Sequence, residues 1–231
     1  MSRSCSRSQV RASAFIAALA FAAALLPNLP ARADDGWETL VSQDGVSVRE
    51  RSSPDRALPE LEAEVEIDAG LFEILAVITD VPKQTRWMSD CIESRFVRVE
   101  SADLALVYNR TGEPWPISDR DVVLRTEATL LAPGEHAAVH FANVEDPGAP
   151  PVDGVVRMPR LSGAYDLIAL SPTRTRVSYR LDADPGGSVP SWATSRFARN
   201  TPLQTLLGLR KQVLATRGQY AEFVAEWSAR R

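Results

Sequence analysis

Hydrophobic and polar residues alternate along much of the chain with the period of two that is typical of half-buried β-strands. The alternating runs cover residues 46–50, 60–67, 93–100, 103–111, 120–131, 135–144, 155–158 with 164–170, and 174–182. The later runs are joined by connections too short for crossover helices, and these connections carry turn residues such as Pro133-Gly134. The pattern therefore predicts an antiparallel sheet with one apolar and one charged face.

Two stretches switch to the three-and-four spacing of an α-helix. The first covers residues 69–80, and Asp68 before it is a candidate cap. The second runs from about residue 188 to Leu214, after Asp184-Pro185-Gly186-Gly187 ends the last strand in a tight reversal. A brief helix or turn is also expected over residues 37–41.

The long C-terminal helix is predicted to be amphipathic. Its apolar residues fall on one face: Trp192, Phe197, Leu203, Leu206, Leu207, Val213 and Leu214. Asn200-Thr201-Pro202 interrupts the pattern, because the residue before a proline is displaced from the helical conformation. We therefore expect a kink, or two abutting helices with Thr201 capping the second. Since the apolar face must be buried, we predict an α+β fold in which a curved antiparallel sheet wraps this helix, with the helix as the lid of a hydrophobic cavity.

The first 33 residues have the pattern of a secretory signal peptide. Three arginines precede an apolar run over residues 12–26, and Ala31-Arg32-Ala33 provides an Ala-x-Ala site, so we expect cleavage after Ala33. The run is shorter than the roughly 20 residues of a spanning helix, although a retained membrane anchor is the alternative. We expect the mature chain in the periplasm, with one domain over residues 34–217 and a C-terminal helical tail over 218–231.

Composition and charge narrow the range of partners. The 231 residues, 45% of them hydrophobic, can bury the core of one domain. The formal charge of −4 becomes −8 when the signal peptide leaves with four arginines and no acidic residue, so nucleic acid is not an expected partner. Cys5 also leaves, and Cys91 then has no internal disulfide partner. A lone cysteine in an oxidising compartment is most often buried and inert.

No residue pattern in the chain predicts catalysis or a bound metal. His136 and His140 are four apart on a predicted strand, which separates them by about 13 Å, too far for one ion. Asp119-Arg120-Asp121 is the densest charge cluster, with both carboxylates on one strand face and the arginine opposite. We expect structural salt bridges there, because an acid and base pair needs a shared substrate pocket. Catalytic residues, metal ligands and cofactors are therefore not expected.

The candidate ligand-binding residues are mostly aromatic. They lie near strand ends or on the final helix, where a cavity between sheet and helix would be lined: Trp87, Tyr108, Trp115, Tyr165, Tyr179, Trp192 and Phe197. Each of them is either a cavity residue or a core residue. Leu203 and Leu206 of the helix complete the apolar lining, and Arg157 is either a surface residue or the single polar anchor of an apolar pocket.

Several short motifs follow one another in a characteristic order along the chain. They are Trp87, Glu113-Pro114-Trp115-Pro116 leading to Asp119-Arg120-Asp121-Val122, Val156-Arg157-Met158, Thr175-Arg176-Val177-Ser178-Tyr179, Asp184-Pro185-Gly186-Gly187-Ser188-Val189-Pro190-Ser191-Trp192, and Leu209-Arg210. Together they resemble the START (steroidogenic acute regulatory protein-related lipid transfer) domains, specifically the exported bacterial members, over about residues 37–214. The resemblance implies a helix-grip fold and non-catalytic binding of one lipid or other hydrophobic molecule, gated by the C-terminal helix. We expect a monomer that contacts a membrane surface transiently.

Two features depart from that family, and two other functions stay open. Ser195 stands where members often have asparagine, and the aromatic tail over 218–231 runs past the usual end. The tail is either a helix for a partner or a membrane surface, or it packs on its own domain. An enzyme of the helix-grip superfamily, such as a cyclase or hydrolase, would point Asp121, His136 or His140 into the cavity. An interaction module would have a cavity filled by its own side chains.

Overall fold

The structure, a computed structural model, describes residues 36–52, 56 and 58–230. The predicted signal peptide and its cleavage site lie outside these ranges. The strands are β1 Glu38–Gln43, β2 Val46–Arg51, β3 Glu60–Ile67, β4 Cys91–Val99, β5 Leu104–Thr111, β6 Arg120–Ala132, β7 His136–Asn143, β8 Val156–Arg157, β9 Arg160–Ser171 and β10 Arg174–Asp184. The helices are α1 Leu71–Thr79, the 3-10 helix η1 Val81–Arg86, α2 Ser191–Ala215 and α3 Ala221–Ser228.

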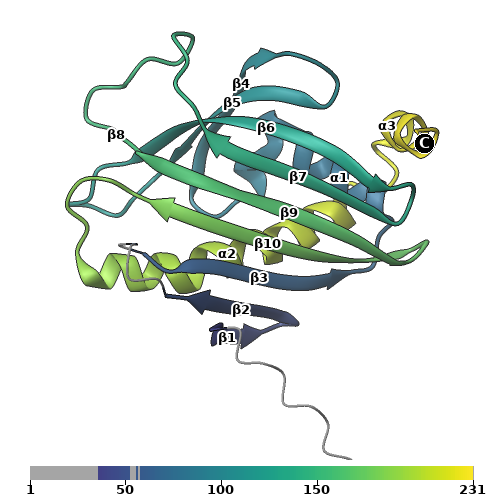
Figure 1. The fold of residues 1–231 in the computed structure, drawn as a ribbon, viewed down its shortest axis with the longest axis horizontal. Helices are drawn as coiled ribbons and strands as arrows, with labels where there is room; N and C mark the ends of the chain where they lie inside the picture. Colours follow the sequence, from purple (N-terminus) through teal and green to yellow (C-terminus); the bar gives the residue numbers. More distant parts are fainter. Residues whose placement is uncertain (1–35, 53–55, 57, 231) are drawn as a thin grey trace, which may run out of the picture. The chain divides into compact units, whose positions relative to one another are not determined.

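The strands form one antiparallel sheet in the order β1-β2-β3-β10-β9-β7-β6-β5-β4 (Figure 1). Only β8 lies off this path, and it pairs in parallel with the start of β6. Alternate residues are buried in strands such as β10 and β3, and in β3 these are Leu61, Ala63, Val65 and Ile67. Within the described ranges, no helix combines the length and the hydropathy needed to cross a membrane.

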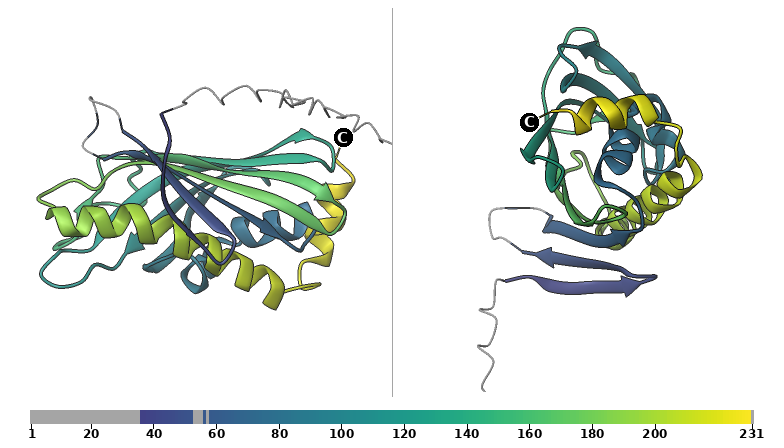
Figure 2. Two further views of the ribbon diagram at one scale, coloured as in Figure 1. Left: turned by 90° about the horizontal axis from the view of Figure 1, so that it is seen from below. Right: turned by 90° about the vertical axis from the view of Figure 1, so that its right-hand side faces the viewer.

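The sheet curls around the helices and holds them in its concave side (Figure 2). Helix α2 packs on β1, β2, β3 and α1, while α3 packs on α1 at the end of the molecule. Leu206 and Leu209 of α2 are fully buried in the core that results. The predicted fold, a curved antiparallel sheet wrapped around a long C-terminal helix, is confirmed.

Two local predictions were wrong. The segment after Trp37 is strand β1 rather than a helix, because Asp44 and Gly45 take positive φ values of 50° and 77° and fold it back onto β2. Gly70, not Asp68, is the N-cap of α1. The backbone nitrogen of Gly70 donates a hydrogen bond to the Glu73 carboxylate at 3.1 Å. Neither correction changes the predicted fold class.

Helix α2 is continuous through Pro202, so the alternative of two abutting helices does not hold. Its axis changes direction partway along its length in both views (Figures 1 and 2), as expected where a proline ring displaces the backbone of the preceding turn. The reversal before it follows the prediction, since Gly186 and Gly187 have φ values of 63° and 64°. The helix begins after Pro190, slightly later than the predicted start at about residue 188.

The C-terminal tail packs on its own domain. In α3 the Trp227 side chain is only 2% exposed, and its ring lies 6.4 Å from that of Phe72 in α1. The tail therefore belongs to the core rather than standing free for a partner.

Candidate functional site

An apolar cavity of about 100 Å³ lies between the concave face of the sheet and α2. Its apolar lining comes from five strands, two helices and the segments that follow η1 and β8: Ile78, Met88, Val107, Val122, Leu124, Val139, Phe141, Met158, Leu161, Leu181 and Phe197. Helix α2 adds Phe197, Thr201 and Thr205, so this helix is the wall that closes the cavity. A cavity of this kind favours the burial of an apolar molecule.

A second chamber of about 280 Å³ lies beside the first. Four lining residues, Ile78, Gln84, Val107 and Thr126, are common to both and form the wall between them. On the far side, Tyr220 and Phe223 of the tail line the second chamber. The tail thus lines a space that adjoins the candidate site.

The wall between the chambers carries a closed set of hydrogen bonds. The amide nitrogen of buried Gln84 donates to the Ile78 carbonyl at 3.1 Å, and its oxygen accepts from Asn109 at 3.0 Å and Ser94 at 2.9 Å. These polar groups satisfy one another, so their hydrogen bonds do not depend on a ligand.

Two tyrosines supply hydroxyl groups to the middle of the cavity. The rings of Tyr165 and Tyr179 stack with centroids 4.5 Å apart, and Trp87 meets Tyr165 edge-on at 6.2 Å. Burial raises the pKa of both tyrosines. For Tyr165 the neighbouring Tyr179 raises the pKa further. Both phenols therefore stay protonated and can donate hydrogen bonds.

A buried arginine forms the other polar part of the lining. Arg120, only 5% exposed, stands at the start of β6, and its Nη1 donates to the Ser118 carbonyl at 2.5 Å. Its Nε has no hydrogen-bond partner among the residues described. Sequence reasoning missed this residue, because it read Asp119-Arg120-Asp121 as one charge cluster. The alternation of β6 was the available signal, since it puts Arg120 on the same face as Val122 and Leu124.

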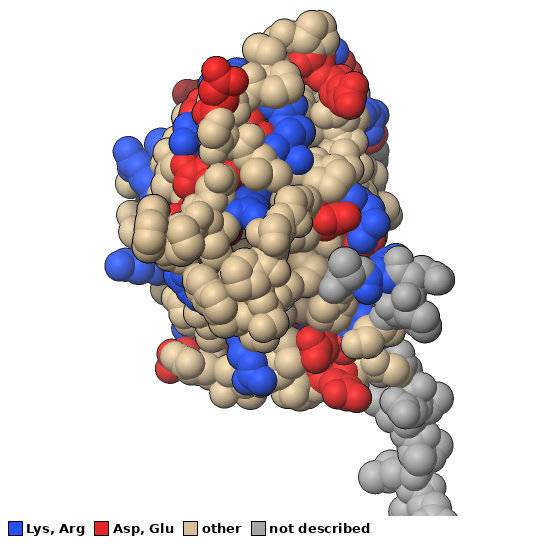
Figure 3. Space-filling model, turned by 90° about the vertical axis from the view of Figure 1, so that its left-hand side faces the viewer, with Lys and Arg blue, Asp and Glu red and all other residues tan. Residues whose placement is uncertain are grey.

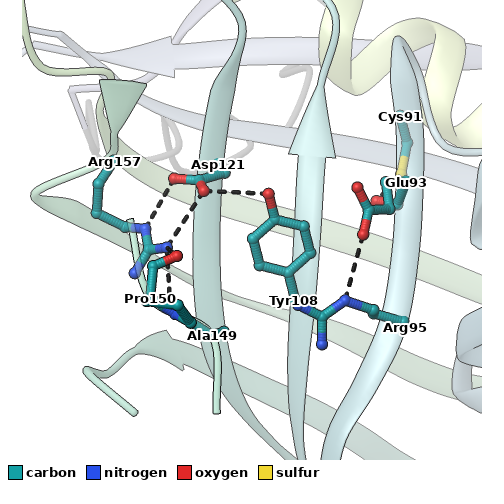
Figure 4. A network of polar contacts seen from close by, with 8 residues as sticks. All are labelled: Cys91, Glu93, Arg95, Tyr108, Asp121, Ala149, Pro150 and Arg157. Carbon is teal, nitrogen blue, oxygen red and sulfur yellow. Dashed lines mark hydrogen bonds and ion pairs between the residues drawn. The ribbon is translucent and has the colours of Figure 1, made fainter. Parts of the chain in front are cut away.

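Arg157 belongs to a polar network on the opposite, outer face of the sheet (Figure 4). Its Nε donates to Asp121 Oδ1 at 2.7 Å and its Nη2 to the Ala149 carbonyl at 3.1 Å. The Tyr108 hydroxyl donates to Asp121 Oδ2 at 3.1 Å, and burial with the Asp121 charge raises the pKa of Tyr108 to about 12. Arg157 and Tyr108 therefore brace the loop between β7 and β8, and neither lines the cavity.

The ten candidate residues separate into four groups, of which Arg157 and Tyr108 in the outer-face network are the first. Tyr165, Tyr179 and Phe197 line the cavity. Trp87, Leu203 and Leu206 are buried in the surrounding core, behind the lining side chains. Trp115 and Trp192 are 91% and 51% exposed, because one lies on the loop between β5 and β6 and the other on the outer side of the first turn of α2. The part that each residue plays in ligand binding stays a prediction.

The titratable residues considered for catalysis lie away from the cavity. His136 and His140 alternate with inward-facing Ala137 and Val139, and His136 Nε2 pairs with Asp166 at 2.6 Å on the outer face. Burial raises the pKa of the Cys91 thiol. Among the described residues, no group of three or more His, Cys, Asp and Glu side chains has the arrangement of a metal site.

Comparisons with known proteins agree on one family. The family model described as "START domain" matches residues 20–214. An uncharacterized protein of Pseudomonas aeruginosa is 32% identical over 176 residues, which is 76% of this chain and 86% of that protein. The phosphatidylcholine transfer protein of Bos taurus is 26% identical over 174 residues, covering 74% of this chain and 81% of that protein.

Solved structures show the same fold. The STAR-related lipid transfer protein of Xanthomonas axonopodis superposes with a TM-score of 0.71 at 29% identity, covering 78% of this chain and 99% of that one. Human StAR-related lipid transfer protein 5 gives a TM-score of 0.71 at 21% identity, covering 80% and 89% of the two chains.

Proposed function

The chain belongs to the START domain family, and from that premise we propose that it binds one lipid or other hydrophobic small molecule in the cavity beneath α2 and carries it between membranes. The observation that carries the proposal is the lining of that cavity, where apolar side chains surround a few buried hydrogen-bond donors. Burial of apolar ligand surface contributes about 25 cal/mol per Å², while the donors orient the polar end.

The size of the cavity requires movement during binding. Ligand sites usually enclose about 300–1,000 Å³, and the cavity of about 100 Å³ is smaller than that. A lipid must therefore extend into the second chamber or displace part of α2. The half of α2 before Pro202 is the element suited to move, because it is more exposed than the half that follows. We propose that this half is the gate that sets the exchange rate.

We also propose transient contact with a membrane surface at the end of the molecule where α2 begins. Trp115 and Trp192 are exposed near this end, and uncharged side chains occupy the middle of the face shown in Figure 3. Tryptophan prefers the boundary between water and lipid, since its ring is apolar and its N–H is polar.

Replacing both tryptophans with serine is expected to weaken co-sedimentation with phosphatidylcholine vesicles several-fold and to slow lipid transfer, without lowering the lipid content of the purified protein. Leu131→Ser is the matched control, because Leu131 is an exposed apolar residue elsewhere, near the C-terminal end of β6. Equal co-sedimentation of wild type and the double variant would remove this contact from the proposal.

The periplasmic location rests on the signal-peptide pattern of the first 33 residues. Mass spectrometry of the exported protein tests location and binding together. The intact mass should correspond to a chain that begins at Asp34, and the organic extract should contain one enriched lipid at close to one per protein. An extract with nothing enriched over a control protein, repeated after exposure to a lipid panel, would reject the binding function.

Two other functions are compared with this proposal. Catalysis on an apolar substrate is disfavoured by the outward positions of Asp121, His136 and His140. An interaction module is favoured by one observation, the small volume of the cavity in this conformation. The same extract separates this alternative from lipid binding, because an interaction module would yield no stoichiometric lipid.

A further inference from the structure

Arg120 is a buried cation in the mostly apolar wall of the cavity. Moving a guanidinium out of water costs several kcal/mol unless charge and hydrogen bonds compensate it. Of its five N–H donors, one is used by the Ser118 carbonyl, and Nε has no partner in the described structure. The protein itself therefore satisfies only part of this side chain.

The neighbouring aspartates are already paired with other arginines. Asp119 accepts hydrogen bonds from Arg110 at 2.9 and 2.5 Å, and Asp121 faces the outer side of the sheet, where it pairs with Arg157. Neither carboxylate is free to neutralise Arg120, although Arg120 lies between the two aspartates in the sequence.

Glu113 is the remaining carboxyl group near Arg120. Burial raises the pKa of Glu113, while the positive charge of Arg120 lowers it. No described carboxylate reaches Arg120 within the 4.0 Å of an ion pair. Glu113 therefore offsets the charge from a distance and leaves the guanidinium open to another anion.

The position of Arg120 suits the polar end of an elongated ligand. Besides the main cavity, it lines a small pocket of about 30 Å³ together with Glu113, Pro185 and Phe197, beneath the start of α2. The apolar lining and the second chamber lead away from this point toward the tail. A ligand anchored at Arg120 would thus extend its apolar part along the cavity.

We propose that the ligand is an acyl lipid with an anionic group, a carboxylate or a phosphate, which pairs with Arg120 at the end of the cavity nearest the start of α2. This inference rests on the proposed lipid-binding function and names the class of its ligand. Arginine is suited to the role, because its planar fork of donors matches both groups with two parallel hydrogen bonds. The ion pair also supplies the charge that the buried guanidinium lacks.

The test compares anionic and neutral lipids that share the same chain. Hexadecanoate is paired with hexadecan-1-ol, and phosphatidic acid with the diacylglycerol of the same chains, so that the first pair reports on a carboxylate and the second on a phosphate. The wild-type protein should bind the anionic member of at least one pair about tenfold or more tightly, which is the expected effect of one charge-assisted hydrogen bond.

Arg120→Gln should abolish this preference, because it should lower the affinity for the anionic lipid about tenfold more than the affinity for the neutral lipid. Arg125→Gln is the matched control, because Arg125 lies on the same strand but is exposed on the outer face. Arg120→Lys retains the charge and should keep part of the preference, so it replaces the glutamine variant where that variant fails to fold. Glu113→Gln should leave the preference intact or strengthen it.

The outcomes separate this inference from the function on which it rests. Wild-type protein that binds neutral and anionic lipids equally would overturn the role of Arg120 and leave lipid binding in place. A preference that persists in Arg120→Gln would overturn it as well. Wild-type protein that binds none of the four lipids would overturn both.

Discussion

Replacing Gly208 with alanine is expected to prevent α2 from seating against the segment that carries Trp87. A Cβ at this position would lie 2.1 Å from the Trp87 carbonyl oxygen and 3.0 Å from its carbonyl carbon. Backbone atoms cannot swing aside as a side chain can, so the helix or η1 must shift. We expect a loss of about 3 kcal/mol or more in the free energy of unfolding, which outweighs the roughly 1 kcal/mol that alanine gains over glycine in helix propensity.

Denaturant unfolding of Gly208→Ala against wild type measures this loss. Gln204→Ala is the matched control, because Gln204 is exposed on the same helix, and its effect should stay within about 0.5 kcal/mol. The close approach also matters for the cavity, since the backbone nitrogen of Ser89 donates to Thr205 Oγ1 at 3.2 Å one turn earlier. If the Gly208→Ala variant is as stable as wild type, α2 does not lie so near Trp87.

The sheet and its helix could be predicted because their periodicity is local. In β10, Thr175, Val177, Tyr179 and Leu181 alternate with charged and hydroxyl residues, so one face is buried whatever the strand pairs with. That alternation also placed Tyr179 correctly on the inner side. The long helix followed from the change of period after Gly187.

The lining of the site was harder to predict, because it depends on which strand faces are covered. Tyr108 alternates with Val107 and Asn109, yet both faces of β5 are buried there, since Ala149 and its loop cover the outer one. The hydrophobic pattern alone therefore cannot show which face of β5 lines the cavity. Trp115 lies in a loop, where there is no alternating pattern from which its exposure could be predicted.

The role of Arg120 was hidden by partners that are distant in sequence. Arg110 and Arg157 take the carboxylates on either side of it, and the second of these lies 36 positions away from Asp121. A sequence pattern shows that Asp119 and Asp121 have an arginine between them. The pattern does not show that Asp119 and Asp121 each pair with another arginine. That pairing leaves Arg120 without a carboxylate partner.

The tail beyond Arg217 is expected to matter for stability as much as the family core does. The family match ends at residue 214, yet Trp227 stacks on Phe223 at 5.5 Å, and the Arg230 guanidinium lies 3.9 Å from its ring centroid. Replacing Trp227 with alanine leaves a cavity in this cluster, and such losses typically cost about 3–5 kcal/mol. Thermal unfolding should therefore show a lowered Tm for Trp227→Ala.

The same substitution should affect ligand retention, because the tail lines the second chamber through Tyr220 and Phe223. Loosening α3 opens that chamber, so bound lipid should exchange several-fold faster at a temperature where the variant is still folded. Glu222→Ala is the control, since Glu222 is exposed on the same helix, and it should leave both Tm and exchange unchanged. A lowered Tm with unchanged exchange would mean that α3 stabilises the domain without closing the cavity. Wild-type values for both would mean that the packing of Trp227 contributes to neither.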